Sequence, residues 1–209
     1  MPKKIIIVRH GQTDYNVRDI LQGQLHVPLD KTGIAQAYKV AERLKNELVD
    51  EVFSSDLKRT LQTTDPLGKK LKSKIIPHAA LRERGLGNLE GKHKDIAFKA
   101  LGVHKDGFPL HHFWNFQERK EHRIFNMEPK EELFKRVDDF IDMLRRDYKG
   151  KNVLLVSHGG TIRVILKQLG FADEEYLKRL PIHNTSIIYL IKKAKGYDLE
   201  IEYEHVGIK

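Results

Sequence analysis

The chain of 209 residues (24.3 kDa) is long enough for one large domain with a sizeable core, and its hydrophobic content of 40% is ordinary for a globular protein. It contains no cysteine, which excludes disulfides, thiolate catalysis and cysteine metal sites. The formal net charge of +9 favours an anionic ligand, which could be nucleic acid or a phosphorylated small molecule. The lysines form no run of five or more basic residues, which is typical of a solvated surface.

The first predicted element is a buried strand from Ile5 to Val8, formed by four consecutive β-branched apolar residues. This apolar run is too short for a signal peptide or a membrane span, so we expect a cytoplasmic protein. The strand leads into Arg9, His10 and Gly11. Open α/β sheets bind ligands beyond the carboxyl ends of their strands, so this turn could present an imidazole to a pocket. For Arg9 and His10 alone, an ordinary solvated turn is an equally good interpretation.

Residues 17–30 read as a polar connection, and the pattern that follows predicts a helix from an N-cap at Thr32 to about Leu48. Its expected inward face consists of Ile34, Ala35, Tyr38, Ala41, Leu44 and Leu48. A short strand is predicted at residues 52–54. Asp56 is the expected N-cap of a second helix, in which Arg59 lies in the first turn.

A further strand is predicted at residues 74–77, and it precedes Glu83 and a glycine-rich loop. From residue 92 to residue 127 the periodicity fades, and histidine and aromatic residues accumulate. We predict an inserted lid there with some helix of its own, because structureless connections of this length are uncommon within a compact domain. Trp114 and its phenylalanine neighbours are expected to form the small core of this lid. From Lys130 onward the pattern predicts a long amphipathic helix, with Leu133, Val137, Phe140, Ile141 and Leu144 on one face.

The opening pattern recurs at residues 151–157, where a second apolar strand ends at His158, Gly159 and Gly160. A helix is expected from Thr161 to Leu169, and residues 186–191 and 199–203 predict a hairpin at a sheet edge. This alternation of strands and helices predicts a single α/β domain over residues 1–209, with a mainly parallel sheet and the lid at 92–127.

Two strands that are far apart in sequence therefore each end in a histidine followed by a glycine. Parallel strands place their carboxyl ends at one sheet edge, so His10 and His158 can share a pocket with Arg9 and Arg59. The amides that open the helix at Gly159 could also seat an anion. Guanidinium groups match the geometry of a phosphoryl group, which makes phosphoryl chemistry the best interpretation.

Such a site could work without a metal ion or any other cofactor. One neutral imidazole would attack phosphorus and form a phosphohistidine, which splits one difficult displacement into two easier ones. Glu83 is the candidate general acid for the leaving oxygen and the base for water in the second step. The structural alternative for Glu83 is a salt bridge to Arg82 or Arg84. A serine hydrolase elbow at Ser157 is disfavoured because no glycine lies two residues before it.

Four segments resemble the signature blocks of the histidine phosphatase superfamily, in its phosphoglycerate mutase-like branch: RHGQTDYN (9–16), SSDLKRTLQT (54–63), LRERGLGNLEG (81–91) and VSHGGTIR (156–163). The resemblance implies a three-layer α/β/α fold. It also implies that His10 is phosphorylated, that Arg9, Arg59 and His158 form the phosphate pocket, and that Glu83 donates the proton. It further implies a phosphate contact at Asn16 and substrate contacts at Gln22, Gly23 and Arg84.

The chain departs from this family pattern where many members carry Gly-Glu-Ser, since it has Met127, Glu128 and Pro129. The lid of about 35 residues is short for a mutase that must exclude water, so we expect a phosphatase for small phosphomonoesters. A phosphoglycerate mutase is the second hypothesis, and a nucleic-acid or phosphoprotein binding module is the third. We expect no nucleic-acid partner and no membrane partner. We expect the protein to be a monomer or a homodimer.

Overall fold

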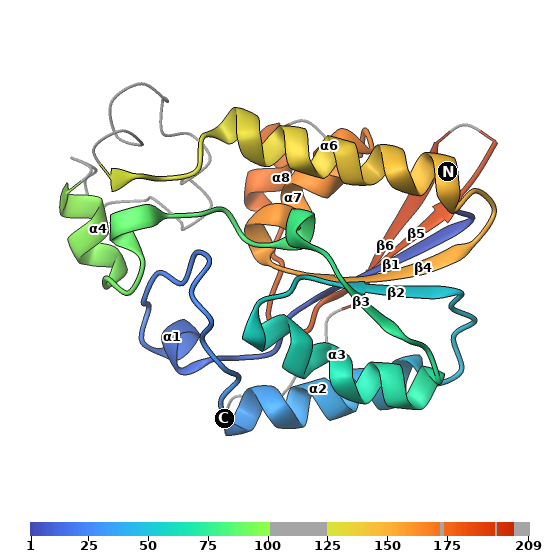
Figure 1. Ribbon diagram of the computed structural model, residues 1–209, viewed down its shortest axis with the longest axis horizontal. Coiled ribbons are helices and arrows are strands. Elements are labelled where there is room, and N and C mark those ends of the chain that lie inside the picture. Colours follow the sequence, from blue (N-terminus) through green and yellow to red (C-terminus); the bar gives the residue numbers. More distant parts are fainter. Residues whose placement is uncertain (101–124, 172–173, 195, 203–209) are drawn as a thin grey trace.

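The computed structural model describes residues 1–100, 125–171, 174–194 and 196–202, and its centre is a six-stranded sheet (Figure 1). The strands are β1 (Lys4–Arg9), β2 (Glu51–Ser54), β3 (Ile75–Pro77), β4 (Asn152–Ser157), β5 (Ile187–Lys192) and β6 (Tyr197–Glu202), in the order β3-β2-β4-β1-β5-β6. The first four strands run parallel, whereas β5 and β6 form an antiparallel hairpin at one edge. The predicted mainly parallel sheet and its terminal hairpin are thereby confirmed.

The register of the two central strands explains why their histidines come together. Ile5 of β1 pairs with Val153 of β4, and the pairing continues without a break to Arg9 and Ser157. The His10 amide then donates to the Ser157 carbonyl at 3.0 Å. The next residue of each strand, His10 or His158, therefore leaves the sheet at the same edge.

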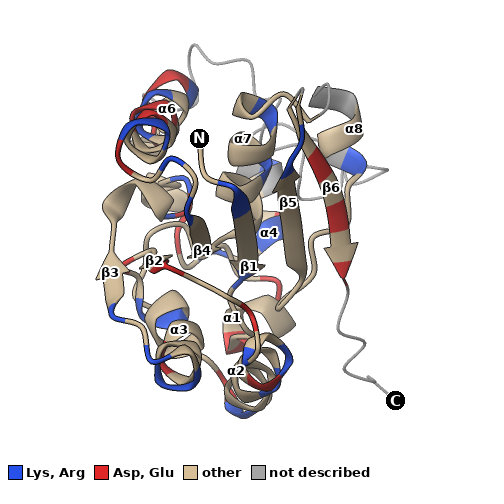
Figure 2. Cartoon of the chain, turned by 90° about the vertical axis from the view of Figure 1, so that its right-hand side faces the viewer, with Lys and Arg blue, Asp and Glu red and all other residues tan. Residues whose placement is uncertain are grey.

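Helices cover both faces of the sheet and give three layers (Figure 2). On one face lie α2 (Lys31–Leu44) and α3 (Lys58–Leu71), and on the other lie α6 (Lys130–Asp147), α7 (Gly159–Gln168) and α8 (Glu174–Arg179). Alternate residues of β1 serve the two cores, since Ile5 and Ile7 face α6 and α7 whereas Ile6 and Val8 face α2 and α3. The predicted α/β/α architecture is confirmed.

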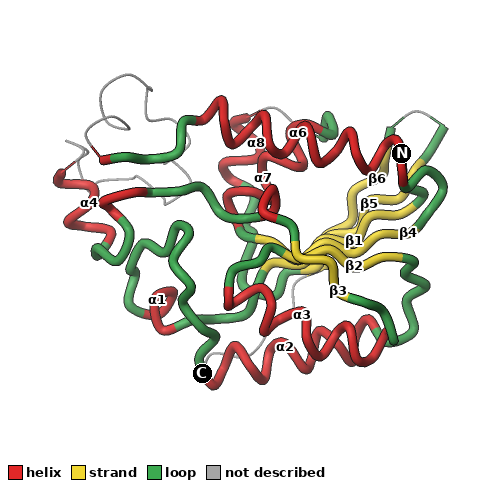
Figure 3. Tube along the Cα trace, viewed as in Figure 1, coloured by secondary structure: helices red, strands yellow, loops and turns green. Residues whose placement is uncertain are grey.

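The remaining short elements lie beyond the carboxyl ends of the parallel strands, where the functional site is formed. They include α1 (Asp14–Val17) and α4 (Lys94–Ala100), which lie together past that end of the sheet (Figure 3). Two 3₁₀ turns, Ala79–Leu81 and Gly87–Leu89, frame the segment that carries Glu83. The helix α4 falls within the predicted lid, but residues 101–124, including Trp114, lie outside the described residues. No helix in the described part of the chain is long and apolar enough to cross a membrane.

The predicted N-cap of α2 was wrong, and its predicted inward face was correct only at Ala41 and Leu44. Asp30 is the N-cap, and its side chain accepts from the Gly33 amide at 2.7 Å. The buried face consists of Gly33, Gln36, Ala37, Val40, Ala41 and Leu44, whereas Ile34 and Tyr38 are exposed. A Cβ atom at Gly33 would lie 2.0 Å from the Gln12 carbonyl oxygen. Close approach to the loop after β1 therefore requires glycine at position 33.

The predicted N-cap of α3 was also wrong. Leu57 occupies that position without a side-chain hydrogen bond, while the Asp56 carboxylate forms a bidentate pair with Arg82 at 2.5 and 2.6 Å. This pair commits Arg82 to Asp56, so one of the two predicted structural alternatives for Glu83, a salt bridge to Arg82, is not formed. In contrast, the long helix α6 buries all five predicted residues, Leu133, Val137, Phe140, Ile141 and Leu144.

Candidate active site

The imidazoles of His10 and His158 lie side by side at the carboxyl ends of β1 and β4. Their ring centroids are 5.1 Å apart, and the ring planes are inclined at 56°. Both rings are buried, with 3% and 0% of the residue surface exposed. The strand register has thus brought together two histidines separated by 148 positions, as the sequence predicted.

The hydrogen bonds of His10 leave one ring nitrogen available. Its Nδ1 lies 2.7 Å from the Gly11 carbonyl oxygen, which can only accept, so Nδ1 carries the proton and Nε2 carries a lone pair. Burial, followed by the charges of Arg59 and Arg9, lowers the pKa of His10 well below its ordinary value. The ring is therefore neutral at pH 7, which is the form that a nucleophile requires.

Both ring nitrogens of His158 are bound within the protein. Arg59 Nε donates to its Nδ1 at 3.1 Å, so Nε2 carries the proton and donates to Ser55 Oγ at 2.9 Å. Burial and the Arg59 charge lower the pKa of His158 well below its ordinary value. In this arrangement His158 holds the Arg59 guanidinium through Nδ1, and a direct bond from His158 to a phosphate would require an exchange of partners.

Two buried arginines supply positive charge beside the histidines. Arg59 is 1% exposed, and its terminal nitrogens donate to the Leu25 and Gly23 carbonyls, both at 2.8 Å. Arg9 donates through Nη1 to the Ile182 carbonyl at 2.7 Å, but its buried Nε has no partner among the described residues. Burial lowers the pKa of each guanidinium to about 10, so both keep their charge at pH 7. An unpaired buried donor of this kind indicates a site for an anion.

The carboxylate of Glu83 occupies the N-terminus of α7. Its Oε2 accepts from the Gly160 amide at 3.0 Å, and its Oε1 accepts from the Thr161 amide at 3.2 Å and from the Arg84 amide at 3.0 Å. The anion seat predicted at the start of this helix thus holds a side chain of the protein itself. A Cβ atom at Gly160 would lie 2.3 Å from Glu83 Oε1, which explains the need for glycine there.

His10, Arg9, Arg59 and Glu83 line one cavity of about 270 Å³, whereas His158, predicted to share this pocket, lies behind them and is not part of its lining. Its described lining comprises Arg9, His10, Asn16, Ile20, Leu21, Gln22, Gly23, Arg59, Glu83, Arg84, Leu86, Lys130, Leu133, Gly159, Gly160, Arg163 and Ile182. Glu83 is the one carboxylate among these described residues, against five cationic side chains. Apolar side chains also contribute to the lining, namely those of Ile20, Leu21, Leu86, Leu133 and Ile182.

The structure places each of the other predicted site residues at the same cavity. Asn16, Gln22, Gly23, Arg84 and Gly159 all line it. Asn16 also caps α1, accepting through Oδ1 from the Thr13 amide at 3.1 Å, while Arg84 Nε donates to the Glu128 carbonyl at 2.9 Å. The buried Oε1 of Gln22 has no partner within the described chain. It is therefore a free acceptor in the cavity wall.

Several residues that shape the site had not been predicted. Ser55 holds His158, and Asn184 donates to the His10 carbonyl at 3.0 Å. Arg163 lines the cavity and donates to the carbonyls of Leu177 and Leu180, both at 2.9 Å, which ties the end of α8 to α7. Arg163 could have been found from its position one helical turn after Gly159, but Asn184 follows no sequence signal.

Comparison with known proteins identifies the family of the chain. The family model described as "Histidine phosphatase superfamily (branch 1)" matches residues 5–202. A "Broad-specificity phosphatase" of Saccharomyces cerevisiae is 34% identical over 203 residues, covering 93% of this chain and 82% of its own length. "Phosphoglycerate mutase-like protein 4" of Arabidopsis thaliana is 31% identical over 193 residues, covering 88% and 77%.

Solved structures agree on the fold. A mycobacterial glucosyl-3-phosphoglycerate phosphatase, solved with vanadate (VO₃), superposes with a TM-score of 0.75 at 24% identity, covering 96% of this chain and 97% of the other. The chain belongs to the histidine phosphatase superfamily, branch 1. It is an enzyme of the class that contains phosphatases and phosphoglycerate mutase-like proteins.

Proposed function

We propose that the protein is a metal-independent phosphomonoesterase that hydrolyses small phosphorylated metabolites through a phosphohistidine on His10. The observation that carries this proposal is the pairing of a neutral, buried His10, whose Nε2 is free, with an adjacent arginine donor that has no partner. A phosphoryl group between them would satisfy both groups at once. The name of the yeast phosphatase supports the same activity.

In the first step, the Nε2 lone pair of His10 attacks phosphorus, and the ester P–O bond breaks. The electron pair leaves with the substrate oxygen, which takes a proton from Glu83 and departs as the alcohol. Arg9 and Arg59 stabilise the charge that spreads over the equatorial oxygens. The Gly11 carbonyl keeps the proton on Nδ1 and balances the positive charge of the phosphorylated ring.

In the second step, water attacks phosphorus while Glu83 accepts its proton, and the N–P bond breaks to restore His10 and release phosphate. The Glu83 carboxylate is suited to both steps because three main-chain amides fix its position. We place Asn16 at the phosphoryl group and Gln22, Gly23 and Arg84 at the substrate, as the family resemblance implies. Gly159 is placed at the substrate because its amide lies at the start of α7.

A small substrate fits the size of the site, since about 270 Å³ is at the low end of the range for ligand pockets. The free Gln22 acceptor would suit a hydroxyl or amino group of the organic part. Hydrolysis ranks above mutase activity because the predicted lid at residues 92–127, inserted in a single domain, is short. The name of the Arabidopsis relative keeps phosphoryl transfer between hydroxyls as the second candidate.

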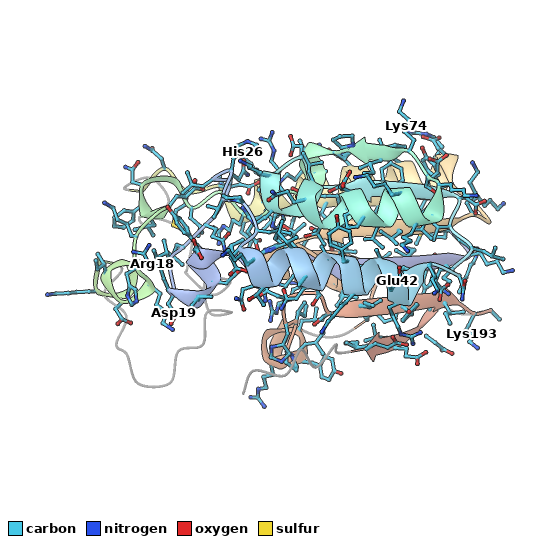
Figure 4. The ribbon with its side chains drawn as sticks, turned by 90° about the horizontal axis from the view of Figure 1, so that it is seen from below. Arg18, Asp19, His26, Glu42, Lys74 and Lys193 are labelled. Atoms are coloured by element: carbon cyan, nitrogen blue, oxygen red, sulfur yellow. The ribbon has the colours of Figure 1, made fainter. Side chains whose placement is uncertain are left out.

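Binding of nucleic acid ranks third because the lysine and arginine side chains are spread over the surface and are not concentrated at the candidate active site. Lys and Arg lie in both helical layers (Figure 2). Arg18 lies near α1, whereas Lys74 and Lys193 lie toward the opposite end of the molecule (Figure 4). Such scattered charge is typical of a solvated surface rather than of a nucleic-acid groove.

The test combines His10→Ala with rate measurements on the wild-type protein. The variant should lose turnover of p-nitrophenyl phosphate together with the acid-labile phosphate that the wild type acquires on brief exposure to ³²P-labelled substrate. Retained turnover would exclude His10 as the nucleophile. A wild-type rate of phosphoryl transfer between the hydroxyls of a phosphoglycerate well above the hydrolytic rate would favour the mutase instead.

A further inference from the structure

An ion pair outside the cavity holds the main chain that carries Glu83. Arg136 lies on α6, and its Nη1 donates to the Ala80 carbonyl at 2.6 Å while its Nη2 donates to the Glu83 carbonyl at 3.1 Å. One planar guanidinium thus spans the segment from the 3₁₀ turn to the proposed acid.

Glu128 completes the arrangement from the other side. Its Oε1 accepts from Arg136 Nε at 2.5 Å, and its Oε2 accepts from Arg136 Nη2 at 3.0 Å and from the Gly85 amide at 2.9 Å. The Glu128 amide donates to the Gly85 carbonyl at 2.8 Å, and the Glu128 carbonyl accepts from Arg84 Nε at 2.9 Å. The two side chains therefore fix the chain before, at and after Glu83.

The ion pair can affect the position of Glu83 without contacting a substrate in the cavity. The Glu128 and Arg136 side chains are 13% and 21% exposed, so solvent screens their interaction only weakly. Neither is among the described residues that line the cavity. Leu133 and Val137 anchor the same turns of α6 in the core. The guanidinium is thus held on a rigid element.

We propose that Glu128 and Arg136 are positioning residues for the general acid, a role that rests on the proposed function of Glu83. Two anchors set the carboxyl group: the amides of α7 bind its oxygens, and the ion pair binds its main chain. Proton transfer needs the carboxyl within hydrogen-bond reach of the leaving oxygen, and a misplacement of about 1 Å can cost about 10²-fold in rate. Loss of the pair releases the second anchor while leaving His10 and its arginines in place.

The test uses the leaving group as the readout. An alkoxide needs a proton as it departs, whereas p-nitrophenolate is stable without one. Arg136→Met should therefore lower kcat for glycerol 1-phosphate by about 10²-fold and kcat for p-nitrophenyl phosphate by less than about tenfold. Glu128→Gln keeps an acceptor for the Gly85 amide but loses the charge, so it should shift the same ratio in the same direction by a smaller factor.

Two reference variants complete the design. Glu83→Gln measures the full effect of losing the acid, and Arg145→Met removes an exposed α6 arginine paired with Asp142, which should leave the ratio unchanged. If Glu83→Gln discriminates between the substrates but Arg136→Met and Glu128→Gln lower both rates equally, the pair is merely structural and the proposal is wrong. If Glu83→Gln itself fails to discriminate, the acid role of Glu83 falls, and the positioning role falls with it. Should Arg136→Met fail to fold, the ratio for Glu128→Gln alone decides.

Discussion

Replacement of Gly160 by alanine should slow catalysis while leaving the protein folded. The new Cβ atom would lie 2.3 Å from Glu83 Oε1 and 3.0 Å from its carboxyl carbon. Ordinary contact needs about 3.5 Å or more between these atoms, so the carboxyl must withdraw by about 1 Å. Since Thr161 N is already 3.2 Å from Oε1, this movement breaks that hydrogen bond.

The two consequences have different magnitudes. Alanine is favoured over glycine in a helix by about 0.5–1 kcal/mol, whereas loss of one hydrogen bond to a charged group costs about 1.5–3 kcal/mol. The net destabilisation of about 1–2 kcal/mol is small beside the usual stability of 5–15 kcal/mol for a domain. A displacement of about 1 Å at the acid should, however, lower kcat for an alkyl phosphate by about 10²-fold.

The assay is kcat for glycerol 1-phosphate together with the melting temperature, measured for Gly160→Ala and for the neighbouring Gly159→Ala. The nearest atoms to a Cβ at Gly159 are Arg163 Nη1 at 3.4 Å and Arg9 Nε at 3.7 Å, and Glu83 is not among them. Since Gly159 is a proposed substrate contact, that variant should raise KM while kcat falls much less than in Gly160→Ala. Wild-type kcat in a folded Gly160→Ala variant would refute the placement of Glu83 as the acid. Equal losses in both glycine variants would show that the cavity tolerates no added methyl group, whatever the position of Glu83.

Three further predictions follow from the histidine pair and its surroundings. The pKa values of His10 and His158 are lowered in the folded state, so the unfolded chain binds more protons than the folded chain below about pH 6.5. The free energy of unfolding should therefore fall as the pH drops through this region, by up to about 1.4 kcal/mol per pH unit for each histidine. Urea midpoints measured between pH 7.5 and 5.5 test this prediction, and a flat profile would contradict it. Ser55→Ala leaves the buried His158 Nε2 proton without its acceptor and should destabilise the fold by about 1–3 kcal/mol in urea unfolding, whereas an unchanged midpoint would argue against the assigned tautomer. Because guanidinium groups supply the positive charge, prolonged dialysis against EDTA should leave kcat for p-nitrophenyl phosphate intact, and a loss that zinc or magnesium reverses would overturn this inference.

The sequence predicted the parts of the site that depend on strand ends. An apolar run such as Ile5–Val8 has one stable location, the sheet interior, and its polar continuation must then emerge at an edge. The same argument applies to β4, and parallel pairing of the two strands then places the residues that follow them at the same edge of the sheet. The face of α2 was mispredicted for a related reason: the largest apolar residues, Ile34 and Tyr38, suggested the core, but the limited space beside the Gln12 carbonyl admits only glycine at position 33.

The supporting contacts could not be predicted because they join polar side chains to main-chain atoms far away in sequence. Arg136 contacts carbonyls 53 and 56 positions before it, and any arginine on an amphipathic helix would look the same in the sequence. Ser55 accepts a hydrogen bond from His158, which lies 103 positions later in the sequence. Its Oγ also accepts from the Leu57 amide, which is the ordinary local bond of a serine in a turn and gives no sign of the distant partner. Such partners follow from the tertiary fold and leave no periodic pattern.

The anion seat at α7 shows how the site divides its charges. A helix N-terminus opened by two glycines could bind a phosphate, yet here it binds the carboxylate of Glu83. The phosphoryl group is then left to the guanidinium side chains. Five cationic side chains, those of Arg9, Arg59, Arg84, Lys130 and Arg163, line the cavity beside this one carboxylate, so positive charge is in excess among the described lining residues. By holding the acid on main-chain amides, the protein keeps its cationic side chains available for the phosphoryl group.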